Sequence, residues 1–205
     1  MFEEKTLEIA SPDDPAHDFL HFKRVVKSAE SLCNLEMAKL EVVLPAAWFH
    51  DFINVPKNDP RRSEASRLSA KAAIQYLREI QYPEVYFAEI AHAIEAHSFS
   101  ANIVANTIEA KIVQDADRLD GIGAIGIARC FATAGILKRP FYSEIDPFCK
   151  VREVNDGAFT IDHFYKKLFK TVEILQTKSA QIEGLRRIKI MKAFLTDLES
   201  EILIP

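Results

Sequence analysis

The stretch "AAWFHDFINVPKNDPRR" (residues 46–62) places His50 and Asp51 side by side at the end of an apolar run. Neighbouring side chains on an α-helix diverge by about 100°, so they share a ligand only where the helix ends and the ligand lies beyond it. A buried aspartate needs a cation or hydrogen-bond donors. The stretch therefore predicts either a metal site at the mouth of a helix or an ion pair of Asp51 with Lys57 or Arg61.

The composition is that of an ordinary globular protein. The chain has 205 residues, 48% of them hydrophobic and 27% charged, and we expect one domain over residues 1–205 with a full core. The formal net charge of −4 argues against nucleic-acid binding, and no apolar run approaches the roughly 20 residues of a membrane span. Three widely separated cysteines form no disulfide or zinc pattern, which favours a reducing, cytoplasmic location.

Apolar residues recur at helical spacing along most of the chain, and no alternating strand pattern is convincing. The sequence therefore predicts an all-α fold. Pro45 is expected to bend its helix or to mark a late start, and "GIGAIGIARCFATAG" fits either a closely packed helix or a loop. Residues 140–158 carry turn signals and predict an irregular segment. Helices are expected over 15–33, 36–51, from a cap at Ser63, from Pro83, and over 103–119, 160–176 and 179–203.

Two further segments carry groups that bind metals. "HDFLH" places His17 and His21 four residues apart, on one face of a helix. "QDADRLD" gathers Asp115, Asp117 and Asp120, and carboxylates so close repel one another unless they are solvated or bound to a cation. The alternatives are hydrogen-bonded surface histidines and a capped helix end with solvated acids.

Taken in order, these motifs resemble the signature of the HD-domain metal-dependent phosphohydrolases. The matching segments are "H-x-x-R-V" from His21, the His50-Asp51 pair, and "D-A-D-R-L-D" around Asp117. The resemblance spans roughly residues 15–130. It implies an all-helical bundle and a metal site formed by His21, His50, Asp51 and Asp117, with His50 and Asp51 as the catalytic pair.

Segments beyond these motifs resemble a subgroup of small, stand-alone bacterial HD proteins, some of which act on nucleotides. They are "N-V-P-K" at 54–57, "H-A-I-E-A-H-S-F-S" at 92–100 and "H-F-Y-K-K-L" at 163–168. Other HD families differ from this chain. Some carry a glutamate three residues after the Asp, where Asn54 stands here, and the cyclic dinucleotide phosphodiesterases carry an adjacent His-His and a Gly-Tyr-Pro motif that do not occur here.

A site of two imidazoles and two carboxylates suits one divalent ion such as Mn, Mg, Fe or Zn. Such an ion lowers the pKa of its water and polarises a phosphoryl group. We expect Lys57 to contact the substrate phosphates, with Arg61 or Arg62 assisting and the other arginine forming a structural ion pair. At least one of His92 and His97 is expected to face the same pocket. The alternative for each cation is a solvated surface charge.

The sequence thus predicts a metal-dependent phosphohydrolase that acts on a nucleotide or another small phosphoester. An alternative is a regulatory or ligand-binding protein that keeps the HD pocket with weak or no catalysis. A third is a structural helical domain in which the His-Asp pair is incidental. The expected partner is a small phosphorylated molecule, with no membrane and no nucleic acid, and the oligomeric state stays open.

Overall fold

The computed structural model describes residues 1–9, 18–53, 55 and 59–202. In these residues every regular element is a helix and no strand occurs, which confirms the all-α fold class. In chain order the helices are α1 (Phe2–Ile9), α2 (Phe19–Glu36), α3 (Leu40–Phe49), η1 (Pro60–Glu64), α4 (Ala65–Glu79), η2 (Glu84–Tyr86), α5 (Phe87–His97), α6 (Ile108–Asp120), α7 (Gly123–Ile136), α8 (Asp162–Lys166), η3 (Leu168–Ile174) and α9 (Lys178–Ile202).

The chain forms two compact units. The first is Met1–Asp117 with Gln176–Ala180, and the second is Arg118–Leu175 with Gln181–Pro205. The chain passes between the units three times: within α6, between Leu175 and Gln176, and within α9. The prediction of one domain over residues 1–205 stays a prediction. Every side chain of the candidate site described below belongs to the first unit.

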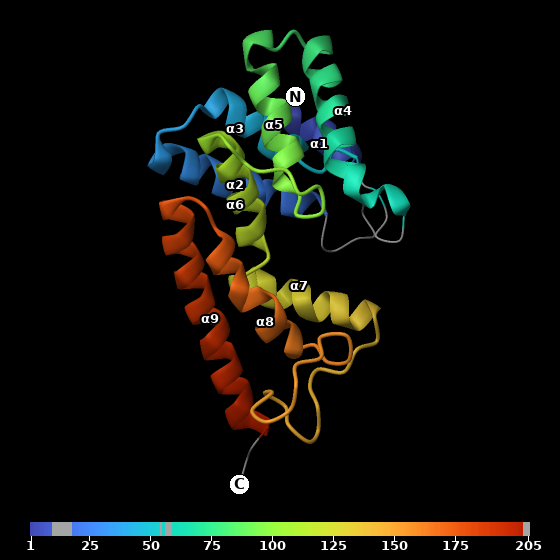
Figure 1. Cartoon of the computed structure of the whole chain (residues 1–205), viewed down its shortest axis with the longest axis vertical. Coiled ribbons are helices and arrows are strands. Elements are labelled where there is room, and N and C mark those ends of the chain that lie inside the picture. The colour runs from blue at the N-terminus through green and yellow to red at the C-terminus, as the bar shows by residue number, and fades with distance from the viewer. Residues whose placement is uncertain (10–17, 54, 56–58, 203–205) are drawn as a thin grey trace. The chain divides into compact units, whose positions relative to one another are not determined.

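Helix α3 lies at the apolar centre of the first unit, because nearly every residue from Val42 to Phe49 is buried. It packs against α2 and α5, while α4 and α5 lie side by side (Figure 1). Pro45 has no N–H, so the Glu41 carbonyl one turn earlier lacks its helical donor. The Tyr82 hydroxyl donates to that carbonyl at 2.7 Å. A side chain from outside the helix therefore replaces the bond that the proline removes.

Helix α2 begins where an aspartate caps it. The Asp18 carboxylate accepts the backbone N–H of His21 at 2.8 Å, which satisfies one of the free donors of the first turn. The helix therefore starts at Phe19, and the expected start at residue 15 lies outside the described residues. The cap also fixes the first turn of α2, from which His21 projects.

The predicted cap at Ser63 is wrong. Ser63 lies inside η1, and the N-cap residue of α4 is Glu64, which makes no side-chain cap bond. The capping side chain acts one element earlier, where Asp59 accepts the backbone N–H of Arg61 at 2.8 Å. The aspartate before the proline is thus the true start signal of this helical region.

The stretch "GIGAIGIARCFATAG" forms a helix, α7, over most of its length. A Cβ at Gly126 would overlap the carbonyl of Gly121, which explains why a glycine stands there. The helix expected from residue 103 begins only at Ile108, because the Thr107 hydroxyl accepts a backbone N–H of its first turn. Helix α1 was not predicted from the sequence.

The second unit contains the irregular segment that the turn signals predict. No helix occurs between residues 140 and 161, all of which are described. Asp146 accepts three backbone N–H groups of this segment, and Asp162 accepts two bonds from the guanidinium of Arg152 at 2.6 Å each. Carboxylates therefore organise a segment that has no regular backbone pairing of its own.

In the part of the chain that the structure describes, no single helix combines the length and apolar composition of a membrane span. The pair of α6 and α7 reaches them only together, across a bend of 61°. The expected absence of a membrane partner stays a prediction.

The Tyr82 hydroxyl yields a test of how Pro45 is accommodated. Tyr82→Phe keeps the ring contacts with Phe2 and Tyr86 but leaves the Glu41 carbonyl without its donor. We expect the free energy of unfolding to fall by about 1 kcal/mol in urea denaturation followed by circular dichroism. Tyr86→Phe is the control and should leave stability unchanged. Equal stabilities of the two variants would contradict this role of Tyr82.

Candidate metal centre

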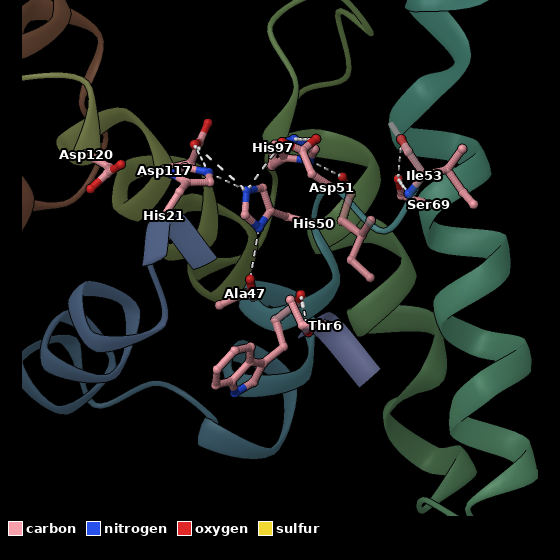
Figure 2. A network of polar contacts seen from close by, with 12 residues as sticks. Thr6, His21, Ala47, His50, Asp51, Ile53, Ser69, His97, Asp117 and Asp120 are labelled. Carbon is pink, nitrogen blue, oxygen red and sulfur yellow. Dashed lines mark hydrogen bonds and ion pairs between the residues drawn. The ribbon is translucent and has the colours of Figure 1, made fainter. Parts of the chain in front are cut away.

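His50 is the central side chain of the candidate site and has no exposed surface. Helix α3 ends at Phe49, and His50 follows as its C-cap. The His50 Nδ1 donates to the Ala47 carbonyl at 2.9 Å. This bond leaves the lone pair of Nε2 free to face the site, which is the arrangement seen in metal-binding histidines. Figure 2 shows the ring standing between two groups of side chains.

The first group consists of His21 and Asp117. The Nε2 atoms of His21 and His50 are 3.3 Å apart. The Asp117 Oδ1 lies 3.6 Å from the Nε2 of His21 and 3.9 Å from that of His50. His21 is fully buried, whereas the Asp117 side chain is about one third exposed. Helices α2 and α6 thus bring an imidazole and a carboxylate to the end of α3.

The second group consists of Asp51 and His97. The Asp51 Oδ2 lies 3.6 Å from the Nε2 of His50, and its Oδ1 lies 3.4 Å from the Nε2 of His97. His97 is the last residue of α5, and its Nδ1 donates to the Ile94 carbonyl at 2.6 Å. His97 therefore presents Nε2 to the site in the same way as His50 does.

The donor atoms fit a divalent cation. In each group, taken together with His50, the ligand atoms all lie within 4.8 Å of one another. Imidazole lone pairs and carboxylates at this separation repel one another unless a cation or a proton lies between them. The set is mixed nitrogen and oxygen, which suits Mn, Mg, Fe or Zn. The cluster could therefore hold a metal ion. Of the expected ligands, His21, Asp51 and Asp117 each place a ligand atom near the Nε2 of His50, at 3.3, 3.6 and 3.9 Å.

The surroundings set the protonation of the two central histidines. Burial lowers the pKa of His50 to about 4, although the Asp51 carboxylate opposes this effect. His50 is therefore neutral at pH 7, the form that binds a metal. Burial also disfavours charge on His97, but the hydrogen bond and charge of Asp51 outweigh it, so its pKa is raised.

The remaining expected residues lie elsewhere or make other contacts. The guanidinium of Arg61 donates to the Asp59 carboxylate at 3.1 and 2.9 Å and is largely exposed. The Nε2 of His92 accepts the backbone N–H of Asn106 at 3.2 Å, so His92 helps to hold the loop after α5. Lys57 lies outside the described residues. The phosphate-binding roles predicted for Lys57 and Arg61 stay predictions, and His92 is the histidine of α5 to which the prediction leaves a structural role.

Of the two histidines of α5, only His97 joins the cluster in the described structure. The sequence left open which of the two histidines faces the site. It predicted His97 as a substrate-binding candidate and not as one of the four metal ligands. The sequence feature that could have indicated His97 as a member of the cluster is its position directly before Ser98, where α5 ends. A histidine at a helix end can turn its ring back onto its own last turn, as His97 does toward Ile94.

The chain belongs to the HD domain family, whose match covers residues 19–122. Bacillus subtilis YpgQ is 31% identical over 198 residues, which cover 95% of this chain and 88% of that protein. The structure of YpgQ in complex with ADP is similar with a TM-score of 0.76 and 29% identity, covering 100% of this chain and 99% of that one. An HD-superfamily hydrolase from Bacillus thuringiensis has a TM-score of 0.74 and 31% identity, covering 99% and 97%. The protein therefore has the fold of the HD-superfamily hydrolases, which confirms the family resemblance.

The cluster predicts a metal stoichiometry. Protein loaded with Mn²⁺ and desalted should hold about one ion per chain, because four converging ligands bind one cation tightly. His50→Ala and Asp51→Ala should each lose the ion, measured by inductively coupled plasma mass spectrometry, with helix content intact. His92→Ala is the control and should keep it. Retention of the ion in both site variants would contradict the assignment.

Burial of His50 also predicts an acid-sensitive stability in metal-free protein. Its pKa of about 4 in the folded state lies below the ordinary 6.5, so between these values the unfolded chain binds a proton that the folded chain does not. The free energy of unfolding should fall as pH drops from 6.5 to 4, by about 3 kcal/mol for about 2.5 pKa units. His97 does not change this trend, because its raised pKa contributes fully below 6.5.

The comparison is with His50→Gln, whose side chain does not titrate. Urea denaturation in a chelating buffer at several pH values should give a smaller decrease for the variant than for the wild type. Parallel curves for the two proteins would show that His50 does not cause the acid sensitivity.

Proposed function

We propose that the protein is a metal-dependent phosphohydrolase that acts on a nucleotide or another small phosphoester or pyrophosphate. The observation that carries the proposal is the convergence of His21, His50, Asp51, His97 and Asp117 at the end of α3. The family match and the hydrolase neighbour from Bacillus thuringiensis support hydrolysis. The ADP complex of YpgQ, a relative similar over nearly the whole chain, supports a nucleotide as substrate.

His21, His50, Asp51 and Asp117 would hold the cation, and His50 and Asp51 are the central pair. A divalent ion bound there supplies an activated water and a positive charge beside a phosphoryl oxygen. Asp51 also reaches His97, whose Nε2 faces the site and can exchange a proton or a hydrogen bond with a phosphoryl oxygen or a water. The partly exposed carboxylates of Asp51 and Asp117 are on the side from which we expect a substrate to arrive.

The phosphate ligands in this proposal are Lys57 and Arg61. For Arg61 the role requires that a phosphate replace the carboxylate of Asp59, because the guanidinium already donates two bonds to it. Such an exchange keeps the bidentate geometry that arginine forms with either anion. Arg62, in contrast, donates to the Val55 carbonyl at 2.7 Å.

The proposal is tested with a panel of nucleoside mono-, di- and triphosphates and a generic phosphoester, with and without Mn²⁺. Phosphate and pyrophosphate are both measured, because together they identify the bond that is cut. We expect metal-dependent turnover that falls at least about 100-fold in Asp51→Ala, since this change removes a metal ligand. Lys57→Ala should lose more activity on triphosphates than on monophosphates.

His92→Gln is the control in this assay and should keep most of the activity, because His92 contacts a loop backbone rather than the cluster. Binding of nucleotides without turnover would favour the ligand-binding alternative. Turnover that Asp51→Ala leaves unchanged would exclude the proposed site.

A further inference from the structure

Gln114 is a buried side-chain amide that the chemistry described so far does not use. It lies on α6, three residues before Asp117, and is only 6% exposed. A buried amide is costly unless its N–H groups and its oxygen find partners. The partners that Gln114 finds therefore indicate what its side chain holds in place.

Both ends of this amide are engaged within the first unit. Its Nε2 donates to the Ala96 carbonyl at 2.7 Å, and its Oε1 accepts from the Nε2 of Gln176. This pattern fixes the orientation of the amide, because a reversed amide would place its oxygen against the oxygen of Ala96. Gln114 can thus act as a defined link between the end of α5 and α6.

The end of α5 depends on such links. The last four carbonyls of a helix have no partner within it. At the end of α5, the Ile94 carbonyl accepts from the ring of His97, and the Ala96 carbonyl accepts from Gln114. The peptide directly before His97 is therefore tied to α6, the helix that carries Asp117.

The other partner of the amide is itself held firmly. Asp115, which has no exposed surface, accepts the backbone N–H of Thr177 at 2.7 Å and its hydroxyl at 2.8 Å. It also accepts the backbone N–H of Gln176 at 3.0 Å. Gln176 is thus fixed at its backbone, and its side chain is a constant donor to Gln114.

We propose that Gln114 is a positioning residue, whose amide holds the last turn of α5 against α6 and so sets the place of His97 Nε2 beside the Asp51 carboxylate. The structural part of this inference concerns His97 alone. The effect of Gln114 on turnover is the second part of the inference, and it rests on the proposed phosphohydrolase function. The two parts are separated by one measurement in metal-free protein and one in the active enzyme.

The first measurement uses Gln114→Glu, which keeps the size of the side chain but cannot donate to the Ala96 carbonyl at neutral pH. Two-dimensional ¹H–¹⁵N spectra of the imidazoles are recorded on metal-free protein, with signals assigned through His97→Gln and His92→Gln. We expect the His97 signals to shift in Gln114→Glu while the His92 signals stay in place. The matched control is Gln75→Glu, an exposed glutamine of α4, which should move neither.

The second measurement is a double-mutant cycle on kcat. Gln114→Glu alone should lower kcat roughly tenfold or more, within the range of couplings between contacting residues. In the His97→Gln background the same change should lower kcat less than about twofold, because the group it positions is gone. A general loss of structure would lower kcat by the same factor in both backgrounds and would overturn the proposal.

The outcomes distinguish the two claims. If the wild-type protein hydrolyses no phosphoester, the proposed function fails, and the imidazole spectra still decide whether Gln114 positions His97. Unchanged His97 signals in Gln114→Glu overturn the positioning role even in an active enzyme. If Gln114→Glu does not fold, the test uses Gln176→Leu, which removes the side-chain donor to Gln114 Oε1. Gln176 is exposed, so the variant should fold, and it should shift the same His97 signals. Unchanged signals in that variant likewise overturn the proposal.

Discussion

The candidate site depends on the hydrogen bond from His50 Nδ1 to the Ala47 carbonyl at the end of α3. This bond satisfies a carbonyl that the helix leaves free, and it turns Nε2 toward the side chains of four other residues. The ring is fully buried, so it has one orientation and one charge state at neutral pH. Without the bond, Nε2 would not face both groups of ligands at once.

The packing of α3 fixes the position of His50 at its end. The helix is apolar nearly all round, packs against α2 and α5, and contains a proline whose missing hydrogen bond is replaced by Tyr82. His21 is positioned by the Asp18 cap of α2, and His97 by the end of α5. Three helix termini therefore supply the imidazoles. Helix ends are where free backbone groups can orient a ring without weakening a helix.

The sequence predicted much of this site because its residues lie in short, ordered motifs. His50 and Asp51 are adjacent, and the order of His21, the pair and Asp117 matches one family's signature. The structure places His21, Asp51 and Asp117 around the Nε2 of His50. Helix ends were less predictable, as the wrong cap at Ser63 illustrates. Several polar side chains near a helix start could accept the free backbone N–H groups, and the sequence does not show which of them does. The choice between the two histidines of α5 needed the tertiary contacts that bury one of them.

The role inferred for Gln114 could not be predicted from the sequence, because it too depends on tertiary contacts. Its partners lie 18 and 62 residues away along the chain. The pairing of Arg61 with Asp59 could not be predicted either, although the two residues are close in sequence. Several carboxylates, or a substrate phosphate, could have accepted the hydrogen bonds of the Arg61 guanidinium. Local patterns thus indicated which groups carry the chemistry, and long-range contacts determined how those groups are held.

The central claim is that one divalent cation binds where the Nε2 of His50 meets the ligands around it. Anomalous X-ray diffraction at the manganese edge, from crystals of Mn²⁺-loaded protein, tests it most directly. The account predicts one strong peak at a coordination distance of about 2 Å from His50 Nε2, with oxygens of Asp51 and Asp117 as further ligands. No peak at His50, or a peak at a site that excludes both carboxylates, would contradict it.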